Sequence, residues 1–92
     1  MPKYYSFKVA DHILYFTSQC IVEAMHVHAS DRKLTEANSA KFFVKSDGDA
    51  VLQNRGDLTD RQINIIRKFI KANYLDMYKM WKDFGGSDFY HG

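Results

Sequence analysis

The 92-residue chain contains a single cysteine, Cys20, so no disulfide can form within it. It has no charged-then-apolar leader and no apolar run approaching about 18 residues, and we therefore expect a cytoplasmic protein that does not enter a membrane. Glycine-rich phosphate loops and paired-carboxylate motifs are also missing, which removes the signatures of two common kinds of catalytic site. No repeat, low-complexity segment or linker divides the chain, so we expect one domain over residues 1–92.

Apolar and aromatic residues are plentiful. They make up 46% and 15% of the chain, which favours a packed globule over a disordered chain. The net charge of +2 is mildly basic and does not by itself imply nucleic acid. The positive charge is unevenly placed, however, because six of the 13 basic residues fall in one segment near the C-terminus.

That segment, residues 59–84, is predicted to be one long helix. Thr59 and Gln62 have the spacing of a capping box, and Gly85-Gly86 supplies a residue able to end the helix. At about 1.5 Å per residue it would reach roughly 37 Å, whereas a compact chain of this size is about 30 Å across. We therefore expect a projecting end or a kink near Asn73, a weak helix former. The expected apolar face consists of Ile63, Ile66, Ile70, Tyr74, Met77, Trp81 and Phe84.

Basic residues gather on the opposite flank of the predicted helix. They are Arg61, Arg67, Lys68, Lys71, Lys79 and Lys82. The simplest interpretation is a solvated face. The alternative is a stripe that binds an acidic partner or a phosphate backbone, with Arg67, Lys68 and Lys71 as the candidate binding residues.

Before the helix, the chain has the alternation and composition of short strands. The five expected strands are residues 4–9, 13–17, 25–29, 40–45 and 50–53. Asp47-Gly48 is typical of a hairpin turn between the last two, whereas residues 18–24 fit either a loop or a continuation of the second strand. We expect an α+β fold in which an antiparallel sheet of about five short strands (about 4–53) is packed by one long C-terminal helix (about 59–84). In the tail, residues 85–92, two aromatic residues could dock against the sheet edge or a partner.

The best candidates for chemistry are His26 and His28. Residues two apart on a strand point to the same side, so the two imidazoles would stand together. That arrangement can begin a zinc or other divalent metal site, but a third ligand is needed. The nearest candidates in sequence are Asp11, His12, Glu23, Asp31 and His91. The pair could instead be solvated or hydrogen-bonded, or it could face a ligand or partner. Nothing marks Cys20 as an activated nucleophile beside them.

The ordered motifs resemble a known family. They are Met25-His26-Val27-His28, Ala40-Lys41-Phe42-Phe43-Val44, the Asn54-Arg55-Gly56 break, Leu58-Thr59, and the helix with Ile63, Ile66, Ile70, Asn73 and Trp81. This pattern is similar to the bacterial family called domain of unknown function 4160, although Val22-Glu23-Ala24 stands where its members usually carry a proline. The resemblance points to His26, His28, Lys41 and Trp81 without assigning them a role. It implies a compact bacterial module, a kind sometimes suspected of belonging to toxin–antitoxin-type pairs.

Two functions follow as hypotheses. The first is a binding or regulatory module without a cofactor that presents His26, His28, Lys41 and the basic helix flank to a protein or nucleic-acid partner, with a homo-oligomer also open. The second is a small metal-binding protein or metal-dependent enzyme built on His26 and His28.

Overall fold

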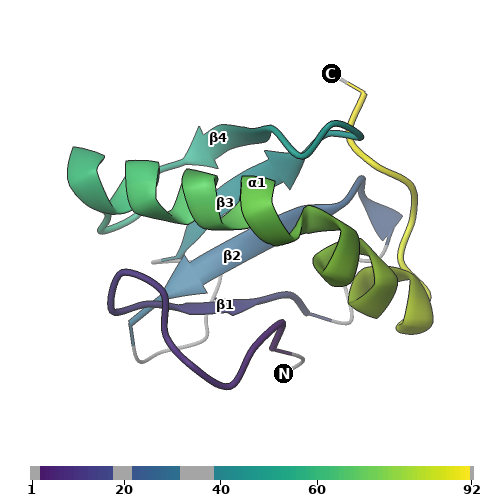
Figure 1. The fold of residues 1–92 in the computed structure, drawn as a ribbon, viewed down its shortest axis with the longest axis horizontal. Coiled ribbons are helices and arrows are strands. Elements are labelled where there is room, and N and C mark those ends of the chain that lie inside the picture. Colours follow the sequence, from purple (N-terminus) through teal and green to yellow (C-terminus); the bar gives the residue numbers. More distant parts are fainter. Residues whose placement is uncertain (1–2, 18–21, 32–38, 92) are drawn as a thin grey trace.

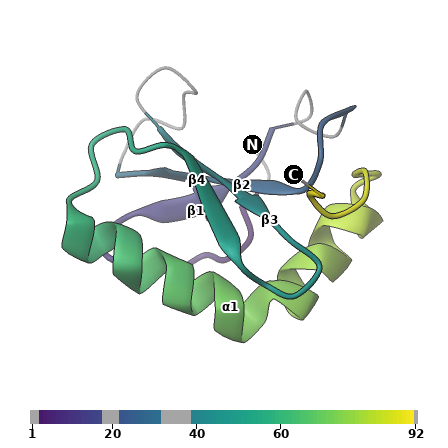
Figure 2. The same ribbon diagram turned by 90° about the horizontal axis from the view of Figure 1, so that it is seen from above.

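In the computed structural model, which describes residues 3–17, 22–31 and 39–91, an antiparallel sheet is covered on one face by a helix (Figure 1). The strands are β1 (Ile13–Tyr15), β2 (His26–Ser30), β3 (Ala40–Val44) and β4 (Ala50–Asn54), and the helix is α1 (Asp60–Asp83). Strands adjacent in the chain are adjacent in the sheet, in the order β1-β2-β3-β4. Figure 2 shows the sheet and α1 as two layers. The expected α+β architecture is confirmed, with four strands in the described chain.

The fifth expected strand, residues 4–9, was predicted wrongly. Within it only Val9 forms a bridge, an isolated one to His12, and the preceding Lys3 forms another with Tyr15. Strand alternation would have placed Phe7 and Val9 on one side, but Phe7 is 52% exposed while Tyr4 and Val9 are buried. The segment instead runs beside β1. Tyr4 and Val9, which were predicted to lie on opposite faces, both pack into the core.

Helix α1 begins as its sequence predicts. The Thr59 hydroxyl accepts from the Gln62 amide at 3.2 Å, and the Gln62 side chain accepts from the Thr59 amide at 3.0 Å, which completes the capping box. Gly85 follows the helix with a φ of +97°, as expected of a helix stop. Within the described residues, no helix has the length and apolar character required to span a membrane.

The helix bends near its middle rather than projecting (Figures 1 and 2). Twenty-four residues would span about 36 Å if straight, and the longest dimension of the molecule is 28 Å. Near the bend, the Asn73 side chain donates to the Phe69 carbonyl at 2.9 Å. Bending keeps both halves of α1 against the sheet.

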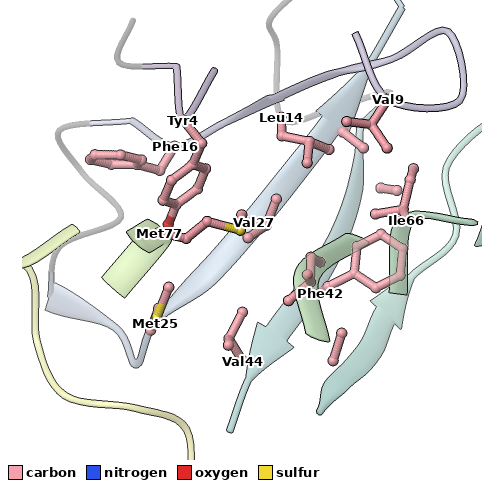
Figure 3. Close-up of a cluster of buried hydrophobic side chains, with 14 of the residues drawn as sticks. Tyr4, Val9, Leu14, Phe16, Met25, Val27, Phe42, Val44, Ile66 and Met77 are labelled. Carbon is pink, nitrogen blue, oxygen red and sulfur yellow. The ribbon is translucent and has the colours of Figure 1, made fainter. Parts of the chain in front are cut away.

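The hydrophobic core lies between the sheet and α1 (Figure 3). Val27 of β2 and Phe42 of β3 are fully buried against helix residues such as Ile66. The helix residues buried in this core are Ile63, Ile66, Ile70, Met77 and Trp81. Phe84 departs from the expected apolar face, since it lies at the C-cap and remains 46% exposed.

The C-terminal tail is docked. The amide of Tyr90 donates to the Val44 carbonyl at 2.9 Å, and the Tyr90 ring stacks on Phe43 with 4.3 Å between centroids. Phe89 stacks on Tyr78 of α1 at 3.9 Å. The tail therefore ties the end of α1 to the end of β3.

Candidate functional site

A cluster of exposed cations lies on the flank of α1 nearest β4. It borders a hollow of about 260 Å³ whose lining residues are Asp49, Ala50, Asn64, Arg67, Lys68 and Lys71. The structure thus brings together three of the residues proposed from sequence as binding residues. Arg61 lies apart from them, because it lines a different hollow beside Ala10 and Asp11.

The three cations of this hollow are not equivalent. Lys71 donates to the Asp49 carboxylate at 2.8 Å and to the Asp47 carbonyl at 2.9 Å. The hydrogen bond from Lys71 lowers the pKa of Asp49, and the same bond raises the pKa of Lys71. Arg67 and Lys68 are exposed and form no ion pair with any described residue. The positive charge available to a partner therefore resides on Arg67 and Lys68.

His26 and His28 stand side by side on β2, as the strand period predicts. Their ring centroids are 5.0 Å apart with planes at 86°. They are only 0% and 4% exposed, so the solvated arrangement considered from sequence is excluded. They alternate with Val27, whose side chain lies in the core beneath α1, so the imidazoles project from the opposite face of β2, where Trp81 in the last turn of α1 reaches His26.

Aromatic rings from three other elements surround the imidazole pair. Tyr15 of β1 stacks on His28 at 5.3 Å. Phe43 of β3 and Trp81 of α1 lie edge-on to His26, at 5.8 Å and 5.4 Å. The two histidines therefore form part of a packed aromatic cluster rather than an open site.

A charged pair adjoins this cluster. Lys41 donates to the Glu23 carboxylate at 2.6 Å, and that hydrogen bond is the largest cause of the lowered pKa of Glu23. The same carboxylate oxygen is 3.7 Å from Nδ1 of His26. Nδ1 of His26 lies 2.9 Å from the Ala24 carbonyl, and because a carbonyl only accepts, this nitrogen carries the proton. In the neutral ring, Nε2 is then the atom with the lone pair.

A metal held by the pair would use Nε2 of His26 together with a ring nitrogen of His28. Among the residues that the structure describes, no three His, Cys, Asp or Glu side chains converge in a way that could hold a metal ion. Cys20 lies outside the described residues. The described part of the cluster thus supplies two imidazoles, and the only charged pair beside them is already joined by its own hydrogen bond.

The sequence-derived candidates divide into two separate features. Lys41 pairs in register with His28 and belongs with the histidines. Arg67, Lys68 and Lys71 belong to α1 and face the β3–β4 hairpin across the hollow, on the other side of the sheet. Since a sheet separates the two groups, they do not form one composite surface.

Two contributors were missed by sequence reasoning. Glu23 was considered only as a metal ligand, but it pairs with Lys41 of β3, 18 residues away. Asp49 was not considered, although it neutralises Lys71. Both contacts depend on strand register and on where α1 crosses the hairpin, for which the sequence has no local signal.

Comparison with known proteins leads to a family. The family model described as "Domain of unknown function (DUF4160)" matches residues 12–82, a stretch that contains all four strands and nearly all of α1. No curated protein gives a significant match. No solved structure does so either. The matched stretch includes His26, His28, Lys41 and Trp81, and the chain accordingly belongs to the DUF4160 family.

Proposed function

We propose that this protein is a small binding module that recruits an acidic protein partner through the flank of α1. The observation that carries the proposal is the placement of Arg67 and Lys68, which are exposed beside a hollow and form no ion pair with any described residue. Side chains without an internal ion pair can pair with carboxylates of another molecule. The regulatory, toxin–antitoxin-type role implied by the family resemblance is one form that such a module would take.

A protein partner fits this flank better than a nucleic-acid backbone does. Phosphate backbones favour a continuous basic surface, because each contact neutralises one phosphate. Here Asp49 neutralises Lys71, and Asp60 pairs with Arg55 near the start of the helix. Such mixed charge favours a partner that places carboxylates at a few positions.

The histidine cluster has an indirect part in this proposal. His26 and His28 are buried, so a partner on that side of the sheet would meet Lys41 and Glu23, whose side chains are 22% and 50% exposed. We propose that the imidazoles hold β2 against Trp81 and position these two charged residues.

The proposal predicts binding to acidic chains. Labelled poly-L-glutamate should bind at low salt in a fluorescence anisotropy titration, and the Arg67→Glu/Lys68→Glu variant should bind about ten-fold more weakly or worse, because two charge pairs become repulsive. A short DNA duplex should bind less well than polyglutamate.

Lys79→Glu/Lys82→Glu is the matched control, since it makes the same change of charge farther along the same helix. Equal losses in the two double variants would mean that only net charge matters, which would contradict a site at Arg67 and Lys68. Stronger binding to DNA, with a steep loss as salt rises, would replace the protein partner with nucleic acid.

A further inference from the structure

Among the residues that the structure describes, none pairs with the outer edge of β4. β4 is the last strand of the sheet, and no described residue forms a bridge with its outer side. At the other end of the sheet the chain covers its own edge, because Lys3 bridges Tyr15 and the Tyr4 amide donates to the Leu14 carbonyl at 2.9 Å. An uncovered edge strand presents backbone groups that can pair with another chain.

Hydrogen bonds of the hairpin show which backbone groups point outward. The Lys45 amide donates to the Asp49 carbonyl at 2.9 Å, so Lys45 and Asp49 occupy a hydrogen-bonded position of the antiparallel pair. In an antiparallel pair, bonded and non-bonded positions alternate, so the next pair, Val44 and Ala50, is non-bonded. The Val44 amide is consistent with this assignment, because it points away from β4 and donates to the Met25 carbonyl at 2.9 Å. Ala50 therefore directs its amide and carbonyl to the outer edge.

Leu52, which lies two residues after Ala50 in β4, has the same geometry. It lies opposite Phe42 in the register, so its amide and carbonyl also point outward, and its side chain is 37% exposed. Residues 50–54 contain no charged residue and no proline. β4 therefore lacks two common devices that discourage an edge strand from pairing, charge and proline. Its one irregularity is a register shift after Leu52, because Leu52 pairs with Phe42 whereas Asn54 pairs with Lys41.

The basic hollow lies directly beside this edge. Ala50 forms one wall of the hollow, and Asn64, Arg67 and Lys68 of α1 form another. Side chains of an added strand would alternate between the two faces of the sheet, so every second one would point to the α1 side. Carboxylates at those positions would meet Arg67 and Lys68.

A second copy of this chain fits the edge poorly. Antiparallel pairing of β4 with its own copy follows a two-fold axis perpendicular to the sheet, which leaves both helices on the same side. The Arg67 and Lys68 side chains of the two copies would then approach one another across the junction. Like charges brought together in this way oppose association.

We propose that β4 accepts an extended acidic segment of a partner protein as an added strand. The segment would form hydrogen bonds with the backbone of Ala50 and Leu52 and would direct its carboxylates to Arg67 and Lys68. This inference deepens the proposed function and rests on it. The backbone bonds would supply affinity, and the alternating side chains would supply selectivity.

The test compares two peptides of about ten residues, a length that matches natural strands. Both alternate glutamate and valine, and one is N-methylated throughout, so that charge is retained and backbone donors are lost. In anisotropy titrations the unmodified peptide should bind at least about ten-fold more tightly, because its amides can bond to the edge of β4. Amide exchange measured by NMR should slow at Leu52 when the unmodified peptide is added, and not with its methylated counterpart.

Leu52→Pro provides a matched test on the protein. It removes an outward-pointing amide without removing a bond between β3 and β4, and edge strands tolerate proline at such positions. We expect roughly ten-fold weaker binding of the unmodified peptide, whereas Leu52→Ala, which retains the amide, should bind within about three-fold of the unaltered protein. If Leu52→Pro fails to fold, the exchange measurement on the unaltered protein decides the matter.

The outcomes separate this inference from the proposed function. Equal affinity for both peptides, lost in Arg67→Glu/Lys68→Glu, would retain the acidic partner and overturn the added strand. Failure of both peptides and of polyglutamate to bind would overturn the two proposals together. Protection of the Leu52 amide that rises with protein concentration in the absence of peptide would identify a second copy as the occupant and would also overturn the inference.

Discussion

Gly86 lies against the indole of Trp81 just after α1. Its amide donates to the Trp81 carbonyl at 2.9 Å, and a Cβ added to Gly86 would stand 2.3 Å from ring atoms of Trp81. That indole is fully buried, and its Nε1 donates to the Ser87 carbonyl at 2.6 Å. It also contacts His26, so displacement of the indole would reach the histidine cluster.

We predict that Gly86→Ala lowers the free energy of unfolding by about 2–3 kcal/mol through overpacking. Urea denaturation measures the loss, and a shift in Trp81 fluorescence should accompany it. Gly85→Ala is the control, because it has open space and only the left-handed backbone penalty of about 1 kcal/mol. Equal losses at the two glycines would contradict the close approach to Trp81.

The sequence predicted the direction in which the His26 and His28 side chains point, but it did not predict that they are buried. The side shared by His26 and His28 follows from the strand period, which is a local property. Their burial depends on Tyr15, Phe43 and Trp81, which come from three other elements. No local pattern states that these rings will meet.

Among the elements, the turn before β1 has an unusual backbone. Ala10 and Asp11 have φ values of +51° and +64°, and the flanking Val9 and His12 are bridged. Left-handed conformations at both central residues are typical of tight hairpin turns that favour glycine or asparagine. Alanine at the first position is therefore strained.

Ala10→Gly should raise the free energy of unfolding by about 1 kcal/mol, because glycine relieves the left-handed penalty. Ala72→Gly, at an exposed position of α1, should lower it by about 1 kcal/mol through lost helix propensity. Thermal denaturation of the two variants should thus shift the midpoint in opposite directions. A decrease for both would show that the Ala10 backbone is not strained.

The elements differed in how well they could be predicted, according to how many local signals each one carries. Helix α1 combines a capping box, a long apolar stripe and a glycine stop, three local signals that agree. Residues 4–9 have alternation alone, and that pattern lost to the packing of Tyr4 and Val9 into the core. Short segments with one signal are easily overridden by tertiary contacts.

At the scale of the molecule, three carboxylates in the described part of the chain join separate parts of the fold. Asp49 joins the β3–β4 hairpin to α1 through Lys71, and Asp88 joins the tail to α1 through a hydrogen bond from Tyr78. Glu23 joins the segment before β2 to Lys41 of β3. In each case the hydrogen bond from the named partner is the largest cause of a lowered pKa.

These shifts predict loss of stability in acid. A carboxyl whose pKa is lower in the folded state stabilises the fold above its unfolded pKa, and this contribution disappears as the pH falls through the folded pKa. The thermal midpoint should therefore hold from neutral pH down to the ordinary carboxyl range near 4 and fall below it. Asp49→Asn should have a flatter profile than the unaltered protein, and an unchanged slope would contradict the Asp49–Lys71 linkage.

Local patterns in the chain were sufficient for the helix and its cap, four of the five expected strands and the shared side of the two histidines, because each depends on neighbours within a few residues. The burial of the imidazoles, the pairing of Lys71 with Asp49, and the open edge of β4 beside Arg67 and Lys68 emerged in the folded molecule. Each of these depends on strand order, register and the crossing of α1, which are set by packing between segments far apart in sequence.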